Sequence, residues 1–211
     1  RLKRNMNWMA HHIRSRTGSL RARLDESDQH KRYYEEMSFR DPLTGLRNRR
    51  YFEWFLSDLL SRPPRDQRIF LALVDCDRFK RVNDTRGHQA GDAVLACLGK
   101  VIGESVRESV DVGFRFGGDE FGVVFRDIDR SDCLNACDRI RRRFAQANAH
   151  GCTVSIGIGA WTPAMGSDPS ALVRSCDALL YRAKGQGGDH VAAPWPAPPS
   201  SPVGRAAASS V

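Results

Sequence analysis

Short apolar runs alternate along the chain with stretches in which apolar residues recur every three or four positions. The runs at 69–74, 114–125 and 153–159 are rich in aromatic and β-branched residues, which predicts strands. Helical spacing predicts helices over 52–60, 94–102, 133–144 and 172–183. Residues 78–92 are polar and end in a glycine-containing loop at 87–92, and His190 and Val191 begin a last short strand.

The run at 114–125 is interrupted at its centre by Gly117-Gly118-Asp119-Glu120. Two strands joined by Gly-Gly, which permits positive φ, predict a β-hairpin that carries two adjacent carboxylates at its tip. An antiparallel hairpin within an alternation of strands and helices predicts an α/β (α+β) fold. We expect a mixed sheet of about five strands flanked by helices.

The two ends of the chain differ from this central domain, which we place at 39–192. In residues 1–38 some apolar residues fall at seven-residue steps (Met6, Ile13, Leu20 and Tyr34), a weak heptad. It predicts a helix that pairs with its own copy, the alternative being a solvated connecting helix. Residues 193–211 are rich in Pro, Ala and Ser, which predicts a disordered tail.

Composition indicates which partners and which cellular compartment to expect. The net charge of +8 suggests acidic partners: nucleotides, nucleic acid or a membrane surface. The six cysteines form no Cys-x-x-Cys pair, so we interpret them as reduced core residues. No apolar run approaches the roughly 20 residues of a membrane span, and no signal peptide is visible. These features predict a cytoplasmic protein. Because the chain starts at Arg1, we expect it to be part of a longer protein, with an upstream sensor or a membrane tether.

Acidic residues cluster where strands end, at Asp75 with Asp77 and at Asp119 with Glu120, and a further acid, Asp92, comes just before a predicted helix. If the first strand neighbours the hairpin, Asp75 and Asp119 meet at one end of the sheet. Oxygen ligands from two strands suit Mg²⁺ (or Mn²⁺), and two such ions could activate a hydroxyl and neutralise a leaving pyrophosphate. The alternative is that these acids only form solvated turns. This alternative is weaker for the three acidic groups taken together, because a hydrophobic hairpin has little structural need for Gly-Gly-Asp-Glu.

Six segments of the chain resemble the motifs of one protein family. The stretch Arg115-Phe116-Gly117-Gly118-Asp119-Glu120-Phe121 resembles the signature of the GGDEF domain, the catalytic domain of bacterial diguanylate cyclases. Segments 41–50, 75–84, 87–92, 153–157 and 180–184 resemble further family motifs in the correct order. The resemblance implies a sheet similar to the palm of nucleotide cyclases and polymerases. It also implies condensation of two GTP into cyclic di-GMP with release of two pyrophosphates.

The resemblance also implies roles for single residues. Asp75, Asp119, Glu120 and the Cys76 carbonyl would hold the metals, two per active site, and Asn83 and Asp92 would read the guanine edge. The GTP would be contacted by Phe79, Lys80, Lys184, Gly117 and Gly118. The catalytic residues would be Lys80 together with Asp75, Asp119 and Glu120. Asp77 and Asp84 are expected to support the fold. One domain holds one GTP, so two domains must face each other, and we expect a homodimer through the N-terminal helix and the facing catalytic domains. A regulatory protein or a sensor domain could act on that helix.

Two positions depart from the family pattern. Where many members carry Arg-x-x-Asp as a product-inhibition site, this chain has Glu108-Ser109-Val110-Asp111, with Arg107 one place out of register. An acid would repel a cyclic diphosphate, so we predict no allosteric product site. Gly188 replaces an Arg that contacts the terminal phosphate, which predicts weaker GTP binding and a lower KM in a Gly188→Arg variant.

Two other functions compete with the cyclase. A non-catalytic domain that binds GTP or cyclic di-GMP is favoured slightly by Gly188. A basic nucleic-acid-binding protein is suggested by Arg47, Arg49 and Arg50 and by the cluster at 139–143. No groove-reading or stacking motif accompanies that charge, so we expect no nucleic-acid partner.

Overall fold

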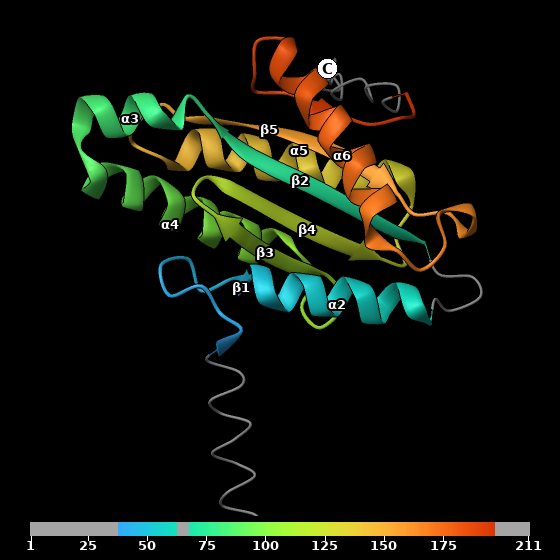
Figure 1. Cartoon of the computed structure of the whole chain (residues 1–211). Coiled ribbons are helices and arrows are strands. Elements are labelled where there is room, and N and C mark those ends of the chain that lie inside the picture. Colours follow the sequence, from blue (N-terminus) through green and yellow to red (C-terminus); the bar gives the residue numbers. More distant parts are fainter. Residues whose placement is uncertain (1–37, 63–67, 197–211) are drawn as a thin grey trace, which may run out of the picture. The chain divides into compact units, whose positions relative to one another are not determined.

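The computed structural model describes residues 38–62 and 68–196. The expected N-terminal helix therefore lies outside the described residues, except for its last residue, and so does the tail from 197 onward. From Asp41 the described chain forms a mixed sheet with helices on both faces, as predicted (Figure 1). Its elements are β1 (Arg47–Asn48), α2 (Arg49–Ser61), β2 (Ile69–Asp77), α3 (Phe79–Arg86), α4 (His88–Ser105), β3 (Val112–Gly117), β4 (Glu120–Arg126), α5 (Arg130–Ala147), β5 (Thr153–Ala160), the 3₁₀ turn η1 (Pro163–Met165), α6 (Pro169–Gly185) and β6 (Val191–Ala192).

The sheet has the order β1-β3-β4-β2-β5-β6. The central strand β2 pairs antiparallel with both β4 and β5, while the short strands β1 and β6 add parallel pairs at the two edges. The predicted hairpin is β3 and β4, which pair antiparallel. Strand β1, which the sequence did not predict, is only two residues long and has no sequence signal of its own.

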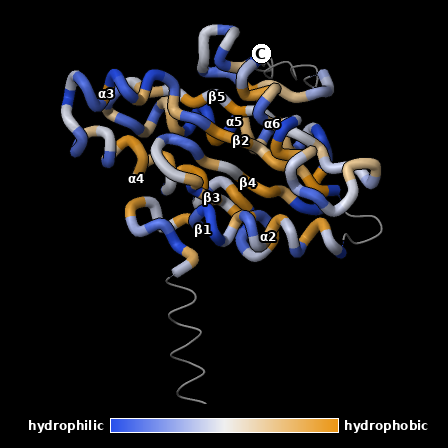
Figure 2. The backbone as a smooth tube through the Cα atoms, viewed as in Figure 1, coloured by the Kyte–Doolittle hydropathy of each residue, from blue (hydrophilic) through white to orange (hydrophobic). Residues whose placement is uncertain are grey.

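Both faces of the sheet are buried, which explains why β2 reads as a continuous apolar run. Alternate β2 residues enter two cores: Phe70, Ala72 and Val74 pack with α4 and α5, and Leu71 and Leu73 pack with α2 and α6. Figure 2 shows apolar residues alternating with polar ones along α2, one of the helices that cover the sheet. Each fully buried Phe or Leu side chain contributes on the order of 2 kcal/mol to stability.

Between β2 and β3 the structure adds one helix that the sequence did not predict and corrects the expected loop. Residues 79–86 form the helix α3, in which Val82 is the only buried residue, so no apolar periodicity marks it. The expected loop at 87–92 is mostly the first turn of α4, which begins at His88. Asp92 therefore lies within a helix rather than before one.

Smaller features complete the description of the domain. Asn48 caps α2 by accepting a hydrogen bond from the Tyr51 backbone N–H at 3.1 Å. All six cysteines are free thiols, and five of them are buried. Residues 193–196 of the stretch expected to be disordered are described, and the Trp195 ring packs edge-on against Phe70 with centroids 5.4 Å apart. Across the described ranges, no helix combines the length and apolarity that crossing a membrane would require.

Candidate active site

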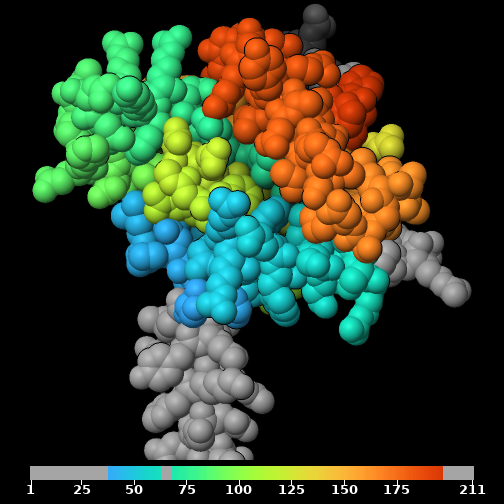
Figure 3. Space-filling view, viewed as in Figure 1, coloured from blue at the N-terminus to red at the C-terminus, as the bar shows by residue number. Residues whose placement is uncertain are grey.

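The hairpin tip lies at the edge of the sheet where β2 ends. Asp75 on β2 stands opposite Glu120 on β4, and the Cys76 backbone N–H donates to the Asp119 carbonyl oxygen at 3.3 Å. Strand β2, which carries Asp75, is therefore the neighbour of the hairpin turn that carries Asp119, which is the condition for their carboxylates to meet. In the space-filling view the hairpin tip reaches the surface between α3 and α6 (Figure 3).

An arginine fixes the conformation of this tip. Gly117 and Gly118 both adopt positive φ (+146° and +50°), and the Gly118 carbonyl accepts hydrogen bonds from Arg115 Nε and Nη2 at 3.2 and 2.9 Å. Arg115 Nη1 also donates to both carboxylate oxygens of Asp41, each at 3.0 Å. Sequence reasoning missed this pair, although a charged residue between two strand phenylalanines was a signal.

Asp41 is held in its ionised form. Partial burial by itself would raise the pKa of Asp41, but hydrogen bonds from Thr44 and Arg115 outweigh burial and lower it. The segment that opens the domain is thereby tied by an ion pair to the hairpin that carries the acids.

Lys184, near the end of α6, reaches the buried acid of the site. Its Nζ lies 2.7 Å from Asp75 Oδ2, and the Asp75 side chain is only 12% exposed. Burial raises the pKa of Asp75 and so do the nearby charges of Asp119 and Glu120, while Lys184 opposes the increase. Three acids at one strand edge thus create a strong local demand for positive charge.

The donors at this edge fit a magnesium ion that shares its coordination shell with phosphates. Within 38–62 and 68–196 no three His, Cys, Asp or Glu side chains form a cage that could hold a metal alone. Mg²⁺ is usually bound by one or two carboxylates plus substrate phosphates, so the paired strand-end acids suit it. The Cys76 carbonyl as a further ligand stays a prediction.

The two residues expected to read guanine are brought together by a glycine. A Cβ atom placed on Gly91 of α4 would lie 2.0 Å from Asn83 Oδ1 and 3.1 Å from Phe79 Cζ. Only glycine therefore allows the Asn83 side chain of α3 to lie against α4 beside Asp92. Asn83 is half-buried and Asp92 is exposed, so both are positioned at a surface between the two helices.

The residues expected at the phosphates begin α3. Arg78 caps this helix with a left-handed backbone (φ +56°), and the half-buried Phe79 and the exposed Lys80 form its first turn. Backbone N–H groups in the first turn of a helix have no partners within the helix, and they favour anions.

Asp77 holds the fold together at this end of the sheet, as expected. Its carboxylate accepts hydrogen bonds from Thr153 Oγ1, Ser155 Oγ and the Asp189 backbone N–H, each at 2.7 Å. Gly188 packs directly on this carboxylate: a Cβ there would lie 2.8 Å from Asp77 Cγ, and Gly188 has φ +82°. A side chain at 188 would be strained and would displace Asp77, which gives a physical reason for the glycine.

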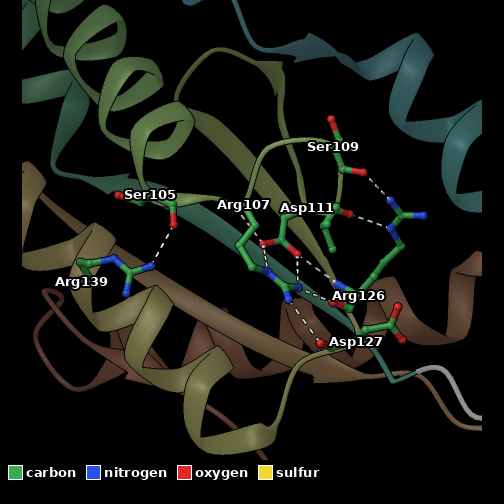
Figure 4. Close-up of polar contacts among 8 residues, drawn as sticks. Ser105, Arg107, Ser109, Asp111, Arg126, Asp127 and Arg139 are labelled. Carbon is green, nitrogen blue, oxygen red and sulfur yellow. Dashed lines mark hydrogen bonds and ion pairs between the residues drawn. The ribbon is translucent and has the colours of Figure 1, made fainter.

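Asp111, in the segment that departs from the family pattern, is already fully engaged (Figure 4). Arg107 Nη2 donates to Asp111 Oδ1 at 2.7 Å, and Arg107 Nε and backbone N–H donate to Oδ2 at 2.9 and 3.0 Å. The Arg126 backbone N–H also donates to Oδ1, at 3.3 Å. The Asp111 side chain is 2% exposed, so a ligand in solution has no access to it.

Comparison with known proteins agrees with this arrangement. The chain is 36% identical over 187 residues to the response regulator PleD of Caulobacter vibrioides, which covers 80% of this chain and 41% of PleD. It is 38% identical over 160 residues to the diguanylate cyclase DgcS of Shewanella oneidensis, covering 73% of this chain and 53% of DgcS. The chain thus spans about half the length of these curated relatives or less.

Solved structures give the same result. The coiled coil and GGDEF domain of DgcB from Caulobacter crescentus, in complex with c-di-GMP, superposes with a TM-score of 0.75 at 27% identity, covering 86% of this chain and 98% of that one. The diguanylate cyclase SiaD of Pseudomonas aeruginosa, in complex with its activator SiaC, gives 0.72 at 31% identity, covering 90% and 76%. These neighbours support the palm-like fold that the resemblance implied. The family profile described as "Diguanylate cyclase, GGDEF domain" matches residues 38–190, and the chain belongs to this family.

Proposed function

We propose that this domain condenses two molecules of GTP into cyclic di-GMP with release of two pyrophosphates. Membership of the family supports cyclic di-GMP synthesis in general. The observation that carries the proposal for this chain is the edge of the sheet where Asp75 on β2 stands opposite the hairpin tip, with Lys184 beside it.

Guanine selection falls to Asn83 and Asp92. A carboxylate accepts hydrogen bonds from the guanine N1–H and the 2-amino group, and an amide both donates and accepts. The close packing of Asn83 on Gly91 supports this role, because it limits where the amide can lie before the base arrives.

The phosphates would lie between the first turn of α3 and the end of α6. Backbone N–H groups near Phe79 and the cations of Lys80 and Lys184 would hold the phosphate chain. Cyclases of this family are generally metal-dependent, and Mg²⁺ held by Asp75 and Asp119 would neutralise charge on the phosphates and on the leaving pyrophosphate. Glu120 would support that site. Two ions per active site is the number that we propose.

Ring closure requires two domains. The 3′-oxygen of one GTP forms a bond to the α-phosphorus of the other, the bond from that phosphorus to pyrophosphate breaks, and the hydroxyl proton passes to solvent. Each domain holds one GTP, so a facing pair performs the reaction twice. Positioning and charge neutralisation supply most of the barrier reduction in transfers of this kind.

Incubation with GTP and Mg²⁺, followed by chromatography for cyclic di-GMP, tests the proposal. Wild-type protein and an Arg142→Gln control on the exposed side of α5 should form the product. An Asp119→Asn variant should lose it while keeping its unfolding midpoint. Absence of product from folded wild-type protein at high concentration would contradict the proposed reaction.

A non-catalytic domain that binds GTP or cyclic di-GMP is the second candidate, and Gly188 is the observation that favours it. Retained binding of a GTP analogue together with no turnover would establish that function.

Dimer formation through residues 1–38 belongs to the same proposal, as does control by a partner on that segment. In the solved complex of SiaD the activator SiaC is bound, which makes regulation by a second protein a reasonable expectation here. Deletion of residues 1–36 should lower the specific activity most at low protein concentration. Unchanged activity there would contradict a role for the segment.

A further inference from the structure

A strongly basic cavity lies between α3 and the start of β5. It has a volume of about 610 Å³, and its walls include Arg78, Arg81 and Arg86 of the α3 segment, His150 before β5, and Asp77 and Gly187. Figure 1 shows α3 beyond the end of the sheet where β2 ends and β5 begins. None of the three arginines was assigned a role by the sequence.

The charge of this cavity is unbalanced. Among the described residues that line it, Asp77 is the only acid, and its two oxygens already accept three hydrogen bonds. In the described ranges, neither the Arg78 nor the Arg81 guanidinium forms an ion pair with a carboxylate. Arg86 Nη1 contacts His150 Nδ1 at 3.0 Å, so two basic groups meet in one wall.

The cavity also adjoins the expected phosphate end of the candidate active site. Asp75 and Asp77 lie two residues apart on β2, so both side chains emerge on one face of the strand. Asp75 contacts Lys184, and Asp77 lines the basic cavity and contacts Gly188. Gly188 supplies no cation, while the cavity that Asp77 lines has three arginines in its walls.

We propose that this cavity is a polyphosphate site, formed by Arg78, Arg81, Arg86 and His150. Guanidinium groups bind phosphate oxygens through paired, charge-assisted hydrogen bonds, and several of them around one cavity suit a ligand with more than one phosphate. The ligand is inorganic pyrophosphate or the terminal phosphates of a bound nucleoside triphosphate. Only this assignment of the phosphate's source rests on the proposed cyclase function.

Calorimetric titration with sodium pyrophosphate, without metal and at fixed ionic strength, tests the site apart from turnover. Wild-type protein and the Arg142→Gln control should bind it. An Arg81→Gln/Arg86→Gln double variant should bind about tenfold more weakly or worse, which corresponds to about 1.4 kcal/mol. The exposed positions of both arginines should leave the unfolding midpoint unchanged, which thermal denaturation checks.

Two results would overturn the proposal: no binding by the wild-type protein, or undiminished binding by the double variant. Loss of binding in Lys184→Met but not in the double variant would place the anion beside Asp75 instead, and would count equally against it. A non-hydrolysable GTP analogue distinguishes the two sources. Weaker analogue binding with unchanged GMP binding in the double variant identifies the nucleotide's terminal phosphates, and unchanged analogue binding identifies released pyrophosphate.

Discussion

The Arg107–Asp111 pair should stabilise the domain measurably. In an Arg107→Ala variant, Asp111 would lose two hydrogen bonds from the guanidinium and keep those from the Arg107 and Arg126 backbone N–H groups. The carbonyl oxygens of Arg126 and Asp127 would each lose a donor as well. A carboxylate that is 2% exposed cannot regain these bonds from water without opening the structure.

The magnitude follows from the exposure of the two partners. Hydrogen bonds to charged groups contribute roughly 1.5–3 kcal/mol each, and breaking a fully buried pair costs about 3–5 kcal/mol. The Arg107 side chain is 44% exposed, so water compensates part of the loss, and we expect about 2 kcal/mol. For a domain of this size that lowers the Tm by about 4–8 °C.

Urea unfolding followed by circular dichroism measures the loss, with Glu108→Ala as the matched control. Glu108 is the adjacent, exposed residue, and its variant should lie within about 0.5 kcal/mol of the wild type. The hydrogen bond to Asp111 raises the pKa of Arg107, so the stabilisation is present at all pH values below that pKa and is lost only at extreme alkaline pH. The difference between Arg107→Ala and wild type should therefore stay constant between pH 6 and 9. Equal stabilities of Arg107→Ala and Glu108→Ala would refute the reasoning.

Three further predictions follow from the same kind of contact. Glu108→Arg should not create a product site that depends on Asp111, because both oxygens of Asp111 already accept hydrogen bonds; calorimetry with cyclic di-GMP checks this, and tight binding that Asp111→Asn abolishes would contradict it. Gly188→Ala should destabilise the domain by at least about 1 kcal/mol more than Gly187→Ala, since both glycines have positive φ but, of the two, only Gly188 lacks space for a Cβ. Equal urea midpoints would disprove the clash. Because a side chain at 188 would displace Asp77, we expect no fall in the KM for GTP in Gly188→Arg. Asp41→Asn should cost about 1–2 kcal/mol at pH 7, because a neutral amide cannot replace the ion pair with Arg115. The pKa of Asp41 is lowered, so its contribution is present above the unfolded-state pKa and disappears as pH falls through the folded-state pKa; the stability curves of variant and wild type should therefore converge in acid, and a constant gap would contradict the assignment.

The strands were predictable because burial leaves a direct mark on composition. β2 is buried on both faces, so almost every position from Ile69 to Val74 must be apolar, and the hairpin repeats that pattern around a glycine turn. Helix α3 left no such mark, since it buries Val82 alone and uses its other positions for polar groups. The sequence shows what a segment buries, and α3 buries almost nothing.

In the candidate site, too, the features that short segments determine could be predicted, and those that depend on contacts between distant segments could not. Acids at strand ends could be identified because their type and their register along β2 and β4 are properties of short segments. The packing of Gly188 on Asp77 joins residues more than 100 positions apart, and the Arg107–Asp111 pair depends on a turn whose conformation has no periodicity. In both places a departure from the family pattern looked like a lost ligand contact. The contacts give a structural reason in each case. A side chain at 188 would displace the carboxylate of Asp77, and the carboxylate of Asp111 already accepts hydrogen bonds from Arg107 and Arg126. Restoring the family's arginine at 108 would leave Asp111 saturated by Arg107 and Arg126. An arginine at 188 would displace Asp77, so neither substitution should restore the function that the family's residue has.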